Sequence, residues 1–301
     1  SLAPPCCSHT NRSPNFGSPV RLGALKNDSL VAESGAPTGT LIAVGGGRNI
    51  EDLLKLLVEK AGGADAPIVV IPTAGGGPDY PPDWSGQREL LEAGARNVTV
   101  LHTYDPKVAD SSAFVQPLRE AKGVWITGGR QWHLADAYLN TQVHDAVRNV
   151  YQRGGVVGGS SAGATILGSY LARGDTKSNV IMMGDHEVGF GFLKNVAIDQ
   201  HVLVRNRHFD LLEIIRAKPH LLGIGLDEDT SIIVHGDALE VAGKSYVTIY
   251  DAGRSIDSGG EFYFMTAGDR LDLKTRKPTR GKYALERVIS SKDYADEVKA
   301  L

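Results

Sequence analysis

The chain has 301 residues, of which 42% are hydrophobic and 22% are charged, with a formal net charge of −3. This is the composition of an ordinary globular protein, and the charge gives no support to binding of nucleic acid or anionic membranes. The two cysteines, Cys6 and Cys7, are adjacent near the start, which excludes a disulfide framework or a cysteine-ligated metal site in the body of the chain.

Residues 1–37 differ from the rest of the chain. They are rich in Ser, Pro, Asn and Gly, and their first acid, Asp28, follows three basic residues, Arg12, Arg21 and Lys26. A basic, Ser-rich, acid-poor start is typical of an organelle transit sequence, and also of a disordered tail. Because the body of the chain has no cysteine, we expect a reducing, cytoplasmic location, with organelle targeting or secretion as alternatives.

From Thr40 onwards, strand patterns alternate with helix patterns. The predicted strands are apolar throughout, which indicates a sheet that is covered on both faces. Strands are predicted at 41–44, 68–71, 98–101, 124–127 and 156–157, and helices near 53–58, 89–93, 113–121, 134–138 and 143–151. This repetition predicts an α/β fold with a mostly parallel central sheet flanked by helices. No apolar run reaches the roughly 20 residues that span a bilayer, so we expect no membrane contact.

After Leu222 the rhythm changes to short strands separated by Gly and Asp turns. They are predicted at 232–234, 239–241, 246–250 and 262–265. We interpret them as an antiparallel C-terminal extension of the sheet's edge. Residues 38–301 would then form a single α/β domain.

The segment Gly159–Gly163 reads G-S-S-A-G and joins a strand to a helix pattern that continues through Leu171. In G-x-S-x-G motifs the serine stands at a strained strand-to-helix turn, which favours Ser161 as a nucleophile. The amide of Ala162 can then stabilise an oxyanion. The alternative is a structural junction in which Ser160 or Ser161 caps the helix.

A catalytic serine needs a base, and the base needs a third group that fixes its tautomer. Among the nine histidines, those that end strand-like runs are His102, His201 and His235. The strand-like run 222–226 ends in three consecutive acids, Asp227, Glu228 and Asp229. Any of these acids can orient a histidine, and spacing alone leaves the pair open.

Several segments together resemble the cyanophycinase family, serine exopeptidases of peptidase family S51. They are 158–164, Asp199-Gln200-His201, Arg205-x-Arg207, 223–230, Gly45–Gly47 and Thr127–Gln131. The resemblance spans about residues 40–270. It implies a class I glutamine-amidotransferase-like α/β fold with the triad order Ser, His, Glu.

The resemblance assigns a role to each triad position. It implies Ser161 as nucleophile, His201 as general base and acid, and Glu228 as the residue that orients His201. The oxyanion hole would combine the amide of Ala162 with one from the Gly128-Gly129 turn. The family cleaves β-aspartyl linkages, releasing β-Asp-Arg dipeptides from a polyaspartate backbone that bears arginines. It implies a homodimer and no cofactor.

The resemblance also implies residues that bind the substrate. Arg205 and Arg207 are suited to the free carboxylates of such a substrate, whereas without the resemblance they would be solvated strand-end residues. The carboxylate of Asp199 could pair with a substrate amine or guanidinium. Gln131 matches a further pocket residue of the family.

Three positions depart from the family pattern. Arg130 stands where the family usually has aspartate, Asp210 where cyanophycinases have a further arginine, and Ser160 where threonine is usual. The first two lie at positions that the family uses for substrate recognition, and neither is a triad residue. A dipeptidase acting on isoaspartyl dipeptides, or a hydrolase of another β-linked amide, fits equally well.

Other functional classes have weaker support. The glycines Gly45–Gly47 resemble a phosphate loop, but they lack the G-x-G-x-x-G spacing and a Walker lysine, so we interpret them as shaping the first strand–helix turn. A non-catalytic binding protein on a hydrolase fold is a third reading. No H-E-x-x-H or comparable motif is present, so we expect no metal.

Overall fold

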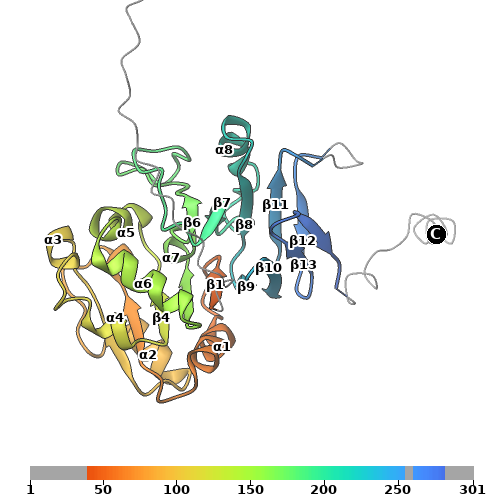
Figure 1. The fold of residues 1–301 in the computed structure, drawn as a ribbon. Coiled ribbons are helices and arrows are strands. Elements are labelled where there is room, and N and C mark those ends of the chain that lie inside the picture. Colours follow the sequence, from red (N-terminus) through yellow and green to blue (C-terminus); the bar gives the residue numbers. More distant parts are fainter. Residues whose placement is uncertain (1–38, 255–259, 282–301) are drawn as a thin grey trace, which may run out of the picture. The chain divides into compact units, whose positions relative to one another are not determined.

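The computed structural model describes residues 39–254 and 260–281 of the chain, all of which lie within one compact unit (Figure 1). The predicted disordered segment 1–37 lies outside the described residues. In the part of the chain that is described, no helix is both long enough and apolar enough to cross a membrane.

A sheet of nine strands forms the centre of the described residues. In spatial order its strands are β14 (Lys277–Thr279), β13 (Arg270–Asp272), β10 (Ala238–Gly243), β9 (Thr230–His235), β1 (Thr40–Val44), β5 (Val156–Ser160), β4 (Gly123–Ile126), β2 (Ile68–Ile71) and β3 (Val98–Val100). Strands β1, β5, β4, β2 and β3 are parallel, whereas β9, β10, β13 and β14 continue beyond β1 with antiparallel pairing. The predicted α/β fold with parallel central strands is confirmed.

A second sheet holds five strands: β12 (Tyr263–Met265), β11 (Val247–Asp251), β8 (Leu222–Leu226), β7 (Leu193–Gln200) and β6 (Gly168–Tyr170). Strands β6, β7 and β8 are parallel, and β11 and β12 pair antiparallel beyond β8. Of the four strands predicted for the C-terminal extension, β9 and β10 extend the central sheet, whereas β11 and β12 belong to the second sheet, so the prediction needs a correction for these two. The chain passes from the second sheet to the first in the short β8–β9 connection, where Asp229 adopts a positive φ of 54°.

Helices cover both faces of the parallel strands. They are α1 (Glu51–Ala61), α2 (Ser85–Glu92), α3 (Pro106–Ala109), α4 (Gln116–Glu120), α5 (Gln131–Tyr138), α6 (Gln142–Gln152), α7 (Ala162–Thr165) and α8 (Leu211–Ala217), with a 3₁₀ helix η1 (Thr73–Gly75). On β1, Ile42 and Val44 pack in the cluster that includes α1, while Leu41 and Ala43 pack in the cluster that includes α5 and α6. Two covered faces explain why these strands are apolar throughout.

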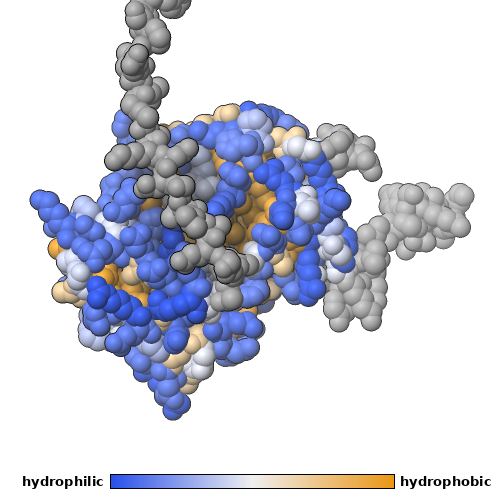
Figure 2. All heavy atoms as spheres, in the orientation of Figure 1, coloured by the Kyte–Doolittle hydropathy of each residue, from blue (hydrophilic) through white to orange (hydrophobic). Residues whose placement is uncertain are grey.

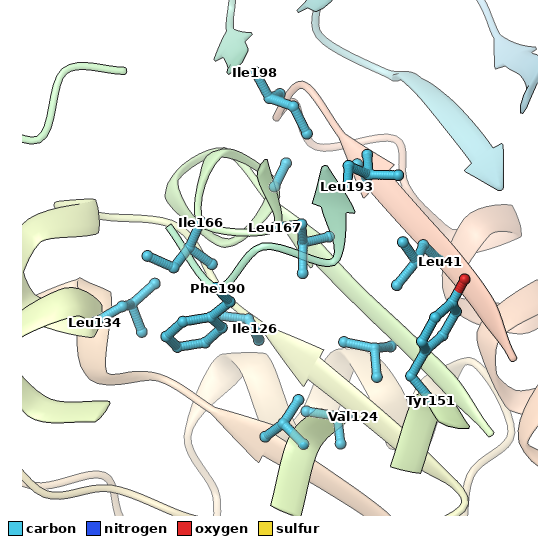
Figure 3. Packing of buried hydrophobic residues seen from close by; sticks show 14 of the residues in the cluster. Leu41, Val124, Ile126, Leu134, Tyr151, Ile166, Leu167, Phe190, Leu193 and Ile198 are labelled. Carbon is cyan, nitrogen blue, oxygen red and sulfur yellow. The ribbon is translucent and has the colours of Figure 1, made fainter. Parts of the chain in front are cut away.

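The largest apolar cluster joins the two sheets. Figure 3 shows Val124 and Ile126 of the central sheet, Leu134 of α5 and Ile198 of β7 within it. Each buried side chain of this size contributes roughly 1.5–3 kcal/mol relative to leaving it exposed. This packing fixes β7 against the central sheet, and with it the residues that follow β7.

The helix predicted to run through Leu171 ends at Thr165, so the prediction is wrong beyond that residue. The carbonyl of Ile166 accepts a hydrogen bond from the amide of Phe190 at 2.7 Å, and the chain continues as β6. The apolar spacing here reflects burial in the core rather than a helix. Because α7 has only four residues, its macrodipole is small. Any stabilisation of a negative charge at its start must therefore come from individual backbone amides.

Candidate active site

Ser161 occupies a strained turn between β5 and α7. Its backbone has φ 55° and ψ −114°, a conformation that other residue types than glycine rarely adopt and that surrounding contacts must hold. The amide of Ser161 donates to the carbonyl of Val44 at 2.9 Å. A Cβ atom on Gly159 would lie 2.3 Å from the carbonyl oxygen of Gly163, so glycine is required there. The turn that the motif predicts is therefore present.

Ser161, His201 and Glu228 form one hydrogen-bonded chain. Nε2 of His201 lies 2.9 Å from Oγ of Ser161, and Nδ1 lies 2.6 Å from Oε1 of Glu228. His201 follows β7 and Glu228 lies just beyond β8, and these two strands pair in parallel with Gln200 beside Leu226. Parallel strands end at the same edge, which brings the two side chains together. With Nδ1 protonated toward Glu228, Nε2 is free to accept the serine proton.

The acids on either side of Glu228 hold loops. Oδ1 of Asp227 accepts the amides of residues 203–204, each at 3.0 Å, and Oδ2 accepts the hydroxyl of Ser245 at 2.5 Å. The carboxylate of Asp229 accepts the amide and the side-chain NH₂ of Asn49 at 2.9 and 2.7 Å. The structure thus separates three acids that spacing alone left equivalent.

The glycine run after β1 lies directly against these residues. A Cβ atom on Gly46 would lie 2.1 Å from Cε1 of His201, and one on Gly47 would lie 2.1 Å from Oδ1 of Asp229. The amide of His201 donates to the carbonyl of Gly45 at 3.0 Å. The run therefore shapes the first strand–helix turn so that it passes close to the histidine.

The electrostatic surroundings favour a neutral His201. Burial lowers its pKa from the ordinary value, and the hydrogen bond that it donates to Glu228 partly opposes this effect. The positive charges of Arg205 and Arg207 lower the pKa further, so the net direction is downward. A neutral imidazole is the form that can accept a proton from serine.

The backbone amides expected to form the oxyanion hole have no hydrogen-bond partner in the described part of the chain. A Cβ atom on Gly128 would lie 3.2 Å from Cβ of Ser161, so this turn approaches the serine closely. Gly129 has φ +142°, and a Cβ atom on it would lie 2.0 Å from the carbonyl oxygen of Ala74. Within residues 39–254 and 260–281, the amides of Gly128, Gly129 and Ala162 donate to no protein acceptor. Free amides beside a nucleophile are what an oxyanion hole requires.

The expected substrate residues differ in how available they are. Arg205 is exposed, whereas Arg207 is buried and donates from Nη1 to the carbonyl and side-chain oxygens of Gln200 at 3.3 and 3.1 Å. Gln131 is also buried, and its Nε2 donates to the carbonyl of Ala172 at 2.7 Å. Only Arg205 therefore presents its charge openly in this structure.

Asp199 is paired within the chain. Its side chain is fully buried, and Nε and Nη2 of Arg173 donate to its two oxygens at 2.7 and 2.8 Å. The carboxylate therefore already holds a cation instead of being free for a substrate amine or guanidinium. Sequence reasoning missed Arg173. The signal that could have indicated it is an aspartate in an otherwise buried strand, which demands a buried cation.

Apolar residues also lie at the surface of the molecule. Figure 2 shows hydrophobic residues gathered over β8 and β11, in the orientation of Figure 1. Among the exposed large apolar side chains, Val204 is 60% and Phe209 is 61% accessible, and both belong to the loop that follows His201. The loop thus offers apolar side chains as well as arginines.

Comparison with known proteins gives consistent matches. The model of Peptidase family S51 matches residues 41–242. A cyanophycinase from Geminocystis herdmanii (strain PCC 6308) is 30% identical over 252 residues, which cover 77% of this chain and 91% of that protein. A cyanophycinase from Nostoc sp. (strain PCC 7120 / SAG 25.82 / UTEX 2576) is 32% identical over 240 residues, 75% of this chain and 78% of that protein. The crystal structure of a peptidase from an acI-B1 Actinobacterium matches with a TM-score of 0.61 and 25% identity, covering 79% of this chain and 98% of that one.

Proposed function

The chain belongs to peptidase family S51, and from this premise we propose that it is a serine exopeptidase that hydrolyses β-aspartyl linkages through Ser161, His201 and Glu228. The family membership makes it a serine-type peptidase. The proposal for the triad is carried by the hydrogen-bonded chain that joins its three side chains at 2.9 and 2.6 Å.

The reaction is acyl transfer. His201 Nε2 takes the proton of Ser161 as Oγ attacks the scissile carbonyl carbon, and Glu228 stabilises the imidazolium that forms. The carbonyl oxygen becomes an oxyanion that accepts hydrogen bonds from the amide of Ala162 and the Gly128-Gly129 turn. His201 then gives its proton to the leaving nitrogen, and the C–N bond breaks to leave an acyl-enzyme.

Water completes the cycle by the same route. His201 takes a proton from a water molecule as the water oxygen attacks the ester carbonyl of the acyl-enzyme. The second tetrahedral intermediate collapses, Ser161 Oγ leaves and recovers its proton from His201, and a carboxylic acid is released. No group other than water is consumed, so the residues of the site suffice for turnover.

The substrate class follows from the relatives and from the charges. Two relatives are named cyanophycinases, which supports a cyanophycin-like or other β-aspartyl peptide substrate. Arg205, which is exposed, would bind a free carboxylate of such a substrate directly, and the buried Arg207 would add positive charge beside it. An isoaspartyl dipeptide is the second candidate, favoured by Arg130 and Asp210. We also propose a homodimer in the cytoplasm, to be tested by light scattering and by localisation of a tagged full-length chain.

The central test compares two adjacent serines. Ser161→Ala should lower the hydrolysis of cyanophycin, β-Asp-Arg and other isoaspartyl dipeptides by about 10⁴-fold or more, because removing a triad nucleophile leaves only binding and oxyanion stabilisation. Ser160→Ala is the matched control and should remain active. A fluorophosphonate should label the wild type and Ser160→Ala but not Ser161→Ala. Near-normal hydrolysis by Ser161→Ala, with products identified by mass, would overturn the proposal.

A further inference from the structure

Arg173 is a buried cation that binds two carboxylates. Its side chain is 1% exposed, and its guanidinium contacts both oxygens of Asp199. Nη2 also lies 2.6 Å from Oδ2 of Asp210, and Nη1 donates to the carbonyl of Asn179 at 2.9 Å. A buried guanidinium is tolerated only when its charge and donors are satisfied, as they are here.

This cluster adjoins the catalytic base. Asp199 precedes His201 by two residues at the carboxyl end of β7. Burial lowers the pKa of Arg207, the charge of Arg173 lowers it further, and the charges of Asp199 and Asp210 raise it. The charge of Arg207 in turn lowers the pKa of His201. The carboxylates held by Arg173 therefore belong to the surroundings of the reacting groups.

The segment around Arg173 also accepts hydrogen bonds from the two residues that follow the Gly128-Gly129 turn. Gln131 donates to the carbonyl of Ala172, and Nη2 of Arg130 donates to the carbonyl of Asp175 at 2.6 Å. Arg130 and Asp210, the two departures from the family pattern that concern substrate recognition, thus bind the same short segment. The charge of Asp210 is paired with Arg173, whereas Arg130 contacts a backbone carbonyl.

Exposed apolar residues stand next in the sequence to two residues that bind this guanidinium. Val180 is 70% exposed and directly follows Asn179, whose carbonyl binds Arg173. Phe209 is 61% exposed and directly precedes Asp210, whose carboxylate binds Arg173. A ligand group at this position would meet apolar surface, with the acids behind it already neutralised.

Building on the proposed β-aspartyl peptidase function, we propose that Arg173 is a specificity-determining residue that occupies an acidic subsite formed by Asp199 and Asp210. The site then selects β-aspartyl peptides whose neighbouring side chain is apolar or uncharged. A substrate guanidinium finds both carboxylates taken and meets the positive charges of Arg205 and Arg207. Such like-charge juxtaposition is costly when it is desolvated.

Citrulline provides the sharpest probe, because it has nearly the shape of arginine without the charge. We expect wild-type kcat/KM for β-Asp-citrulline and β-Asp-Leu to exceed that for β-Asp-Arg by about tenfold or more, the range over which pocket contacts discriminate. Arg173→Met exposes the two carboxylates, so the ratio of β-Asp-Arg to β-Asp-citrulline turnover should rise by about tenfold. Arg173→Lys, which keeps the charge, should retain most of the wild-type preference.

Asp210→Asn is a second variant, to be used if Arg173→Met does not fold. It should fold because the Asp210 side chain is 38% exposed and Arg173 keeps Asp199 as its partner. This variant makes the site more positive, so its preference should move the opposite way, against β-Asp-Arg. Arg153→Met, which removes an arginine bound to backbone carbonyls outside the site, should leave the ratio unchanged.

The outcomes separate this inference from the function on which it depends. If the wild type hydrolyses none of these dipeptides and no cyanophycin, the proposed function fails and the inference fails with it. If the wild type hydrolyses β-Asp-Arg at least as well as β-Asp-citrulline, or if no variant at positions 173 and 210 changes the ratio, the function stands and Arg173 has no role in specificity.

Discussion

Gly46 and His201 approach so closely that a Cβ atom on the glycine would lie 2.1 Å from Cε1 of the imidazole. Gly46 also has φ +111°, a region in which L side chains are strained. The turn after β1 therefore needs glycine for two reasons, one conformational and one that arises from the histidine. The second reason links the first strand of the fold to the proposed catalytic base.

Replacing this glycine should displace the histidine. We expect Gly46→Ala to lower kcat/KM by at least about 10²-fold, because His201 must leave hydrogen-bond reach of Ser161 and general base catalysis contributes about 10²–10⁴-fold. Gly63→Ala is the matched control, since Gly63 has φ +98° and a Cβ atom there meets nothing within 4 Å. Both variants carry backbone strain of about 1–2 kcal/mol. Equal losses of activity in the two would contradict the contact with His201.

Glu228 should act on catalysis with little effect on stability. In Glu228→Gln the amide can donate to Nδ1 of His201, which stabilises the tautomer with the proton on Nε2 and blocks proton transfer from Ser161. We expect kcat to fall by about 10²–10⁴-fold while the urea unfolding curve stays within about 0.5 kcal/mol of wild type. A variant that keeps full kcat would exclude Glu228 as the orienting residue.

Asp227 should behave in the opposite way. Its buried carboxylate accepts the amides of residues 203–204 and the hydroxyl of Ser245. In Asp227→Asn, one acceptor oxygen becomes an NH₂ group, so we expect a loss of about 1–3 kcal/mol in the free energy of unfolding. Urea unfolding measures this directly. If stability is unchanged and kcat falls as far as in Glu228→Gln, Asp227 has a catalytic role instead.

Much of the fold was predictable because burial leaves a local pattern. The parallel strands are covered on both faces, and this produces the apolar runs seen in β1, β2 and β4. The division into two sheets leaves no such pattern, since β11 pairs with β8 through contacts between distant parts of the chain. The segment after Thr165 shows the same limit, because its apolar residues are buried in the core and the spacing alone resembled a helix.

The site divides in a similar manner. Ser161 and Ala162 could be predicted locally, because a strained turn needs small residues beside the nucleophile. His201 and Glu228 were assigned through the family resemblance, and the membership itself is confirmed by the match over residues 41–242. Arg173 was missed because its partners Asp199 and Asp210 come from two other segments. Only the three-dimensional structure brings such charges together.

The charge of Arg205 should control the pH dependence of turnover. Burial lowers the pKa of His201, and Arg205 lowers it further by destabilising the imidazolium. In Arg205→Gln the pKa of His201 should rise toward its ordinary value, so the acidic limb of the kcat/KM profile should move to higher pH. Arg216→Gln, which removes an exposed arginine paired with Glu261, is the control and should leave the limb in place. An unmoved limb in Arg205→Gln would contradict the electrostatic role.

A second pH effect concerns stability and involves His186. Nε2 of His186 lies 2.6 Å from Oδ1 of Asp136 on α5, and Nδ1 lies 2.9 Å from Oδ1 of Asp185. Burial lowers the pKa of His186, but the hydrogen bonds and charges of the two carboxylates outweigh it, so the net direction is upward. The protonated histidine thus joins α5 to the segment that contains Asp185.

A folded-state pKa raised above the unfolded value gives stability that is fully present below about pH 6.5 and is lost as pH rises through the folded-state value. We therefore expect the free energy of unfolding to fall more steeply between pH 5.5 and 9 (roughly the range in which a histidine titrates) in the wild type than in His186→Gln. Hydrogen bonds from Thr176 and His186 lower the pKa of Asp185 to about 2, so that carboxylate stays ionised throughout this range. Asp136→Asn should reduce the steepness without abolishing it, because Asp185 remains. Urea unfolding at several pH values measures all three proteins, and parallel curves for wild type and His186→Gln would show that the histidine does not stabilise the fold through its charge.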